Sequence, residues 1–321
     1  MCKNLFYKQN MKTVISVFIF CIVLFIYLHI QFQLKVSNDL EMYDLDNEST
    51  TKEKFEEICD LRQPVLFSLD PFNTTMDNII QKYSAYEIKV RNIKDAEYNL
   101  LPLSVSNAIK LFENDTNEKY LSENNADFLK ETGLLKEYKV CNKQIQPPMT
   151  CHTMQDIIFG SSGVETPLRY AINYRNFFTV SEGSVEIKLF PPHSDKHVDP
   201  VSDYENFEFR TLAGTSAWNL PENIKDKVKC IEFTLTPGKA VYIPAYWWYS
   251  MKLGKKSIVH SFQYRTYMNY LAILPNICMY FLQNLNVKRK IVKKAFVKED
   301  LVDNSNNNSN NNSENKNEQL K

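Results

Sequence analysis

The chain has 321 residues, of which 44% are hydrophobic and 24% are charged. Its 38 Lys and Arg residues balance its 38 Asp and Glu residues, so no global basic field points to nucleic acid as a partner. The length allows one large domain or two small ones, and the composition is that of a globular protein.

Residues 13–34 form an almost uniformly apolar run that predicts a transmembrane helix. Roughly 20 such residues span a hydrocarbon core of about 30 Å. A cleaved signal peptide is the alternative, but no small-residue cleavage site follows the run. Lys3, Lys8 and Lys12 precede it, which by the positive-inside rule predicts a cytosolic N-terminus over residues 1–12. We therefore expect a single-pass protein, in contact with membrane lipid through residues 13–34, with the rest of the chain lumenal or external.

Glycosylation acceptors and cysteines give weaker information about this compartment. The Asn-x-Ser/Thr triplets begin at Asn47, Asn73 and Asn114 and agree with a lumenal or external side, although an Asn-rich chain produces such triplets by chance. Cys141 and Cys151 could close a short loop under oxidising conditions. Five cysteines lie beyond the apolar run, so they cannot all pair within the chain.

The polar and acidic residues 35–54 predict a stalk, and the following residues predict helices and strands. Helices are expected near residues 55–61, over 76–83 and over 104–113, the last beginning at a Ser104 cap. A short strand is expected after Pro64, and from Asp156 onward the apolar residues alternate as in strands.

The C-terminal part predicts a helical segment over 266–300, interrupted at Pro275, and a disordered Asn-rich tail over 301–321. A second membrane span over 271–287 is disfavoured because Pro275 and several amide side chains lie within it. A packed helix is the better interpretation, and residues 266–300 offer a surface for a homodimer. The basic run over 288–294 predicts a solvated helix face, with a membrane surface or an anionic partner as the alternative.

Two segments carry the most specific pattern. Residues 236–253 read TPGKAVYIPAYWWYSMKL, a Pro-Gly turn and strand followed by an Ile-Pro corner and paired tryptophans. Residues 161–192 contain Thr166-Pro167, Asn176, Gly183 and a strand ending in Leu-Phe-Pro-Pro. Together they resemble the metal-binding segments of JmjC and cupin-like Fe(II)/2-oxoglutarate oxygenases, including the asparaginyl-hydroxylase branch. The resemblance covers about residues 55–265.

This resemblance also shows which family residues are replaced. In the family, His-x-Asp and a later His bind the iron, and these positions hold Arg169, Ala171 and Tyr249 here. The family's Lys for the co-substrate maps near Val185, and its Asn on the last strand maps near Ser261. A guanidinium, a methyl group and a phenol are poor replacements for two imidazoles and a carboxylate. We therefore expect no iron and no 2-oxoglutarate to be bound.

Two other kinds of site follow from the same residues. Arg169 could favour an anionic ligand in a pocket that would comprise Arg169, Tyr170, Asn176, Tyr249 and Ser261. The alternative, which we favour, is that Arg169 pairs with an internal acid such as Glu165 or Glu182. A further possible metal site, which we disfavour because it falls on a loop, comprises His193, Asp195, His197 and Asp199. His260 alternates with Ser261, so the two side chains should face opposite sides of a sheet, with His260 in a structural role.

The predicted fold is mainly β, a double-stranded β-helix of the cupin jelly-roll type with flanking helices and one N-terminal transmembrane helix. Residues 55–265 form its cupin-like domain. The leading function hypothesis is an inactive, pseudoenzyme-like binding or scaffold module with a protein partner. An atypical Fe(II)/2-oxoglutarate-dependent hydroxylase of a protein substrate and a structural component of a membrane assembly are the alternatives.

Overall fold

The computed structural model describes residues 2–45, 51–70, 72–95, 99–204, 206–212 and 214–286. The chain forms two compact units. The first comprises Met1–Ser202 and Phe209–Ile273, and the second comprises Asp203–Glu208 and Leu274–Lys321. Nearly all residues of the sheets, and the candidate site, belong to the first unit.

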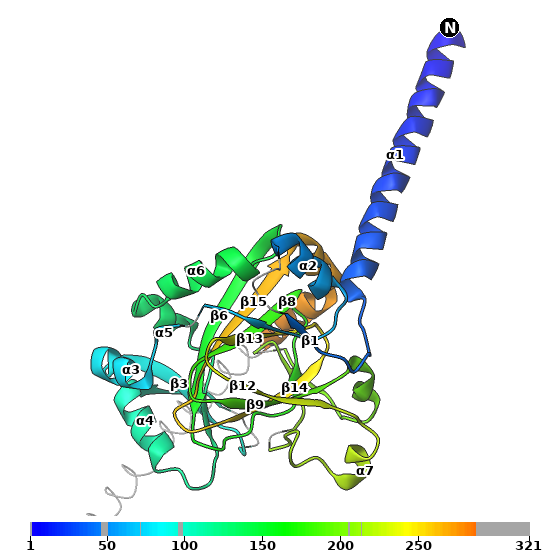
Figure 1. Cartoon of the computed structure of the whole chain (residues 1–321). Helices are drawn as coiled ribbons and strands as arrows, with labels where there is room; N and C mark the ends of the chain where they lie inside the picture. The colour runs from blue at the N-terminus through cyan, green and yellow to red at the C-terminus, as the bar shows by residue number, and fades with distance from the viewer. Residues whose placement is uncertain are drawn as a thin grey trace, which may run out of the picture. The chain divides into compact units, whose positions relative to one another are not determined.

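The first unit begins with the long helix α1 (Cys2–Leu34), drawn in blue in Figure 1. Within the described residues, one helix segment is long and apolar enough to cross a membrane, and it covers Met11–Leu34. Its side chains are exposed along almost the whole segment. A possible N-terminal membrane span, as predicted from residues 13–34, is therefore present as a continuous helix.

Two sheets, which are antiparallel apart from the parallel β1–β2 pair, form the body of the first unit. The larger sheet has the strand order β1-β2-β13-β8-β15-β6-β5-β3-β4, and the smaller has the order β10-β11-β7-β14-β9-β12. The strands of the larger sheet are β1 (Tyr43–Leu45), β2 (Val65–Ser68), β3 (Glu87–Asn92), β4 (Leu101–Ser104), β5 (Tyr120–Ser122), β6 (Thr150–Gly160), β8 (Arg175–Glu182), β13 (Lys239–Ile243) and β15 (Ile258–Thr266). Those of the smaller sheet are β7 (Arg169–Tyr170), β9 (Val185–Phe190), β10 (Val201–Asp203), β11 (Glu208–Arg210), β12 (Ile231–Leu235) and β14 (Trp248–Leu253).

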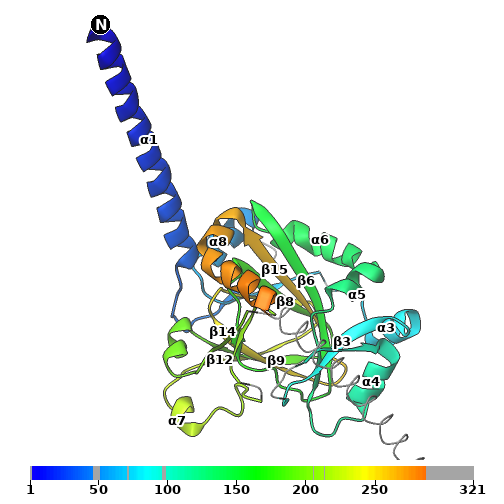
Figure 2. The same ribbon diagram turned by 180° about the vertical axis from the view of Figure 1, so that it is seen from behind.

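Helices flank the sheets, and several of them cover one face of the larger sheet (Figures 1 and 2). They are α2 (Lys52–Asp60), α3 (Met76–Tyr83), α4 (Val105–Glu113), α5 (Ala126–Glu131), α6 (Leu135–Ile145), the 3-10 helix η2 (Pro192–Lys196), α7 (Glu222–Lys225) and α8 (Tyr267–Ala272). One cluster of buried apolar side chains joins α2–α6 to the larger sheet, and a second fills the interior between the two sheets.

This arrangement confirms the mainly β jelly roll with flanking helices. The expected helices over 76–83 and 104–113 are present as α3 and α4, and the Ser104 hydroxyl accepts the Asn107 amide at 3.4 Å as an N-cap. The alternation that predicted strands is that of β9 and β12, which pair with each other along their length. In each case a strong local pattern and a matching tertiary environment agree.

The stalk expected over residues 35–54 is corrected in part. Residues 43–45 form β1, which pairs in parallel with β2, and α2 already begins at Lys52. Asp39 accepts a hydrogen bond from the Gln63 amide at 3.3 Å. The polar composition of this segment predicts a free linker. The prediction fails because the residues that pair with the segment, β2 and Gln63, lie further along the chain.

The C-terminal segment is helical in two pieces. α8 ends at Ala272, and a further helix runs over residues 274–286 in the second unit. Pro275 lies in the first turn of that helix, where its missing N–H costs nothing. Residues 287–300 of the predicted helical segment, with the basic run over 288–294, and the Asn-rich tail over 301–321 lie outside the described residues.

Candidate functional site

Two of the three positions at which the motif comparison predicts replaced iron ligands lie side by side in the first unit. Arg169 on β7 is the cross-strand partner of Tyr249 on β14. Its guanidinium carbon lies 5.5 Å from the centre of the Tyr249 ring. Ala171 directly follows β7, and its carbonyl accepts the Tyr246 amide at 2.9 Å. The three positions taken from the motif thus lie on, or directly after, the paired strands β7 and β14.

The partner of Arg169 is Glu123, which directly follows β5. Arg169 Nη1 lies 2.6 Å from Glu123 Oε2, and Arg91 Nε lies 3.3 Å from Glu123 Oε1. The Glu123 side chain is only 4% exposed and the Arg91 side chain is fully buried. β5 and β3 belong to the larger sheet and β7 to the smaller one, so this carboxylate joins the two sheets through an ion pair with Arg91 and a charge-assisted hydrogen bond from Arg169.

A third cation adds to the field at this carboxylate. Arg210 on β11 is the cross-strand partner of Arg169 and acts on Glu123 through its charge. Burial alone would raise the pKa of the Glu123 carboxyl, but the charges of Arg169, Arg91 and Arg210 outweigh it and lower that pKa. Glu123 is therefore an anion that serves as the counter-ion of these guanidinium groups.

These residues do not fit ferrous ion. A guanidinium has no lone pair to donate at any accessible pH, and the Ala171 methyl group has none at all. The Tyr249 phenol packs against the Phe178 ring, with centroids 5.3 Å apart, within the apolar interior. Among the described residues, no group of three or more His, Cys, Asp or Glu side chains is placed to hold a metal ion.

The other members of the predicted ligand pocket are only partly brought together. Ser261 is paired with Phe178 across β15 and β8, so it faces the same interior as Tyr249. Tyr170 points to the opposite face from its neighbour Arg169 and packs edge-on against Trp248, with ring centroids 4.7 Å apart. Consecutive residues on a strand face opposite sides, which the interpretation of these residues as one pocket overlooked.

Asn176, the remaining member of the predicted pocket, is hydrogen-bonded to neighbouring residues of the chain. Its amide donates to the Asn173 and Ile243 carbonyls at 3.4 and 3.2 Å, and it accepts from the Asn173 amide at 3.3 Å. Asn173 in turn donates to Gln263 at 2.7 Å. The side chain is fully buried and its hydrogen-bonding groups are used within the chain.

The acids first considered as partners of Arg169 pair elsewhere. Glu165 accepts hydrogen bonds from Lys252 and Ser216, and Glu182 accepts the Met76 amide at the start of α3. The prediction that Arg169 meets an internal acid is therefore right, and the two acids named were wrong. Glu123 is 46 residues before Arg169 in sequence, and no local spacing indicates that the two meet.

The histidine loop after Pro192 is exposed and does not converge on a point in the interior. His193, Asp195, His197 and Asp199 are all exposed, and η2 begins within this segment. The His193 amide donates to the Asn38 side chain at 2.9 Å. This hydrogen bond therefore connects the histidine loop to the residues just beyond α1.

His260 lies on the helix-covered side of β15, opposite Ser261, as the alternation predicted. Its ring stacks on Phe72 with centroids 3.9 Å apart. Its Nδ1 lies 2.7 Å from the Tyr138 hydroxyl and its Nε2 lies 3.0 Å from the Ser181 hydroxyl. Burial lowers the pKa of this imidazole to about 3, so the side chain is neutral in the fold.

The remaining sequence candidates concern modification. Asn73 and Asn114 are exposed, the first just before α3 and the second at the C-cap of α4. Asn47 lies outside the described residues. Cys141 and Cys151 are free thiols in the structure.

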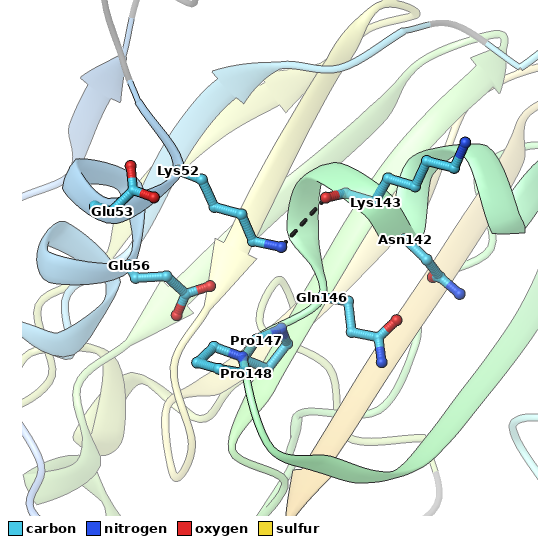
Figure 3. A pocket seen from close by; sticks show the side chains of 8 residues that line it. All are labelled: Lys52, Glu53, Glu56, Asn142, Lys143, Gln146, Pro147 and Pro148. Carbon is cyan, nitrogen blue, oxygen red and sulfur yellow. Dashed lines mark hydrogen bonds between the residues drawn. The ribbon is translucent and has the colours of Figure 1, made fainter.

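A cavity lies outside the sheets, between α2 and α6 (Figure 3). It has a volume of about 530 Å³. Its lining residues are Lys52, Glu53, Glu56, Asn142, Lys143, Gln146, Pro147 and Pro148. Lys52 reaches across from α2 and donates to the Lys143 carbonyl at 3.2 Å. Sequence analysis did not identify this groove, because its two walls are about 90 residues apart in the chain.

Comparison with known proteins gives one match. Residues 53–270 match the family model described as a cupin-like domain. No curated protein matches the chain. The matched range includes every strand of the two sheets except β1, and it includes Glu123, Arg169, Ala171 and Tyr249.

Proposed function

Because the chain belongs to the cupin-like domain family, we propose that it is a single-pass membrane protein whose domain binds a protein partner and carries out no oxygenase reaction. The domain then acts as a binding or scaffold module. This proposal includes the asparaginyl-hydroxylase-like origin of the motifs and the loss of the iron ligands.

The observation that carries the proposal is the Arg169–Glu123 pair. It occupies the ligand positions with a permanent cation and uses the nearest buried carboxylate as a counter-ion. A ferrous ion at this position would require breaking this pair, which leaves a buried charge without its partner and is therefore costly. The Tyr249 ring beside it adds apolar packing to this arrangement.

The proposed orientation places the domain on the lumenal or external side. Lys3, Lys8 and Lys12 on the N-terminal side of the apolar helix support it through the positive-inside rule. Asn73 and Asn114 support it because both acceptors are exposed. Glycan removal from the full chain in membranes tests this: a mobility shift that Asn73→Gln and Asn114→Gln reduce stepwise is expected, and a chain without glycans would count against the orientation.

The groove between α2 and α6 is the surface we favour for the protein partner. Small-molecule sites are mostly enclosed and apolar, whereas this groove is open and offers both signs of charge, two amides and two prolines. Such a lining suits a polypeptide segment. Crosslinking in membranes tests it: Gln146→Arg should abolish a specific crosslink, and Lys110→Glu on the exposed face of α4 should retain it.

Metal analysis of the full chain tests the central part of the proposal. The protein in detergent is loaded anaerobically with Fe(II) and 2-oxoglutarate, desalted, and measured for iron and for succinate after oxygen is admitted. No stoichiometric iron and no succinate are expected. The triple variant Arg169→His, Ala171→Asp and Tyr249→His is the matched comparison.

One outcome would contradict the proposal directly. If the unchanged chain retains one iron per molecule and forms succinate, and if Arg169→Ala alters neither, the metal is held elsewhere and the atypical-hydroxylase alternative is favoured. If crosslinking instead finds only a large assembly with no groove dependence, the structural-component alternative is favoured.

A further inference from the structure

Within Met11–Leu34 of α1, one narrow face is covered by other residues of the first unit, while the remaining side chains of this segment are exposed. Ile26, His29 and Ile30 are partly buried and Gln33 is 9% exposed, whereas their neighbours on α1 are exposed. Their spacing of three and four residues defines one face of the helix. α1 packs against α8, and both belong to the first unit (Figure 2).

The covered face lies inside the apolar part of α1. Met11–Leu34 is about 36 Å long at 1.5 Å per residue, and a hydrocarbon core is about 30 Å thick. If the core begins just after Lys12, it ends near Phe32. Whatever packs against Ile26 and Ile30 must then lie at the depth of the acyl chains or of the headgroup boundary.

α8 presents an uncharged, apolar surface at this depth. Its buried side is formed by Asn269 and by Ile273 just beyond its end, while Tyr267 and Leu271 are 61% and 42% exposed. No Asp, Glu, Lys or Arg occurs between residues 266 and 286, in a chain that is 24% charged. Tyrosine and leucine on the open side of a helix beside a membrane span are typical of the membrane–water interface.

The chain between α1 and the sheets does not allow the domain to stand away from the membrane. The Arg62 guanidinium carbon lies 5.4 Å from the centre of the Phe32 ring, and His193 binds Asn38. β1 then pairs with β2 only nine residues after α1 ends. These contacts hold the last turn of α1 against the domain.

We propose that α8 is an interfacial helix, with Tyr267 and Leu271 inserted among the lipids of the leaflet from which α1 emerges. The occupant of this surface is phospholipid, and the inference rests on the proposed membrane anchor. The next helix, residues 274–286, begins two residues after α8 ends and by itself exposes Leu274, Phe281, Leu282 and Leu285. The apolar pattern of the interface therefore continues along the chain.

Depth-dependent fluorescence quenching in phosphatidylcholine nanodiscs tests this inference on the full chain. All cysteines except the buried Cys59 and Cys141 are replaced by serine, and single labelling sites are then added. Leu271→Cys is the test site, restored Cys21 in α1 is the anchor reference, and Lys110→Cys is the control. Lys110 lies on α4, at the opposite end of the first unit from α1 and α8 in both views (Figures 1 and 2).

Lipids that carry a nitroxide at different depths should then distinguish an interfacial position from a transmembrane position and from a position in water. An interfacial helix lies about 5–10 Å below the headgroup boundary, so a shallow acyl nitroxide should quench the label at position 271 about twofold or more. The label at Cys21 should respond most to a deep nitroxide, and the label at position 110 to neither.

Two results would overturn the inference, and a third would overturn the anchor. Quenching at Cys21 without quenching at position 271 shows that α8 lies in water. Absent quenching at position 271 together with disulfide formation between Leu271→Cys copies shows that a second chain covers this face. Absent quenching at Cys21 shows that the anchor itself is wrong. Tryptophan fluorescence of each variant checks that the fold is retained.

Discussion

Acid is expected to destabilise the fold through His260. The ordinary pKa of an imidazole is about 6.5, and burial lowers that of His260 to about 3. As the pH falls below 6.5, the imidazole of His260 therefore becomes protonated in the unfolded chain but stays neutral in the folded chain. The contribution of His260 to the free energy of unfolding should fall by about 1.4 kcal/mol per pH unit over this range, and by about 5 kcal/mol in total. Above pH 6.5 the contribution is complete.

Asp156 opposes this effect over part of the same range. Burial raises the pKa of its carboxyl to about 6, although three backbone amides donate to it. The folded chain therefore takes up this proton first, and stability from Asp156 is present at low pH and is lost as the pH rises through 6. The two slopes nearly cancel between about pH 4 and 6, so the wild-type profile alone would hide both.

A variant of His260 separates its contribution to the pH dependence of stability from that of Asp156. His260→Gln keeps an amide near the Tyr138 and Ser181 hydroxyls and does not titrate. Urea unfolding of both full chains in detergent, followed by the fluorescence of the buried Trp247 and Trp248, gives the difference in unfolding free energy at each pH. The wild type should lose about 1.4 kcal/mol relative to the variant for each unit below pH 6.5. Parallel profiles for the two proteins would refute the assignment of a neutral His260.

Three further expectations can be checked by the same unfolding measurement. Arg169→Met should cost about 3–5 kcal/mol, because it breaks a buried ion pair, and adding Glu123→Gln should recover part of this loss; a cost below about 1 kcal/mol would contradict the pair. Gly183→Ala should cost more than Gly133→Ala, because both glycines have φ near +75° but only at Gly183 would a Cβ lie 2.7 Å from a backbone atom. Equal costs would contradict that contact. Ser104→Ala should remove the α4 cap and cost about 1 kcal/mol, and an unchanged stability would show that the cap is dispensable.

The fold was largely predictable because its signals are local. Strand alternation in β9 and β12, the Ser104 cap and the uniform apolar run of α1 each express a preference within a short stretch of sequence. The role of β1 was not predictable in this way. Its three residues gain their hydrogen bonds from β2, some 20 positions later, and their own composition resembles a linker.

The sequence predicted that Arg169 and Tyr249 lie close together, but it did not predict which acid pairs with Arg169. The motif places Arg169 next to Tyr249, since neighbouring strands of a known architecture fix that distance. The motif says nothing about Glu123, because the family pattern at this position describes a different side chain and so gives no partner for an arginine. The acid that meets Arg169 is selected by burial and by the charges of other strands, and these follow only from the assembled sheets.

A metal ion and a buried ion pair can have the same structural role in a barrel, since each connects side chains from several strands at one point. Here the point is the Glu123 carboxylate, which takes Arg91 from the larger sheet and Arg169 from the smaller one. Burying these charges is unfavourable, but removing either partner alone is worse, so the arrangement persists once formed. In this barrel the contacts of Glu123 with Arg91 and Arg169 therefore join the two sheets directly. If the proposals above hold, contacts with other molecules are to be sought on the outer surfaces, in the α2–α6 groove and on the exposed side of α8.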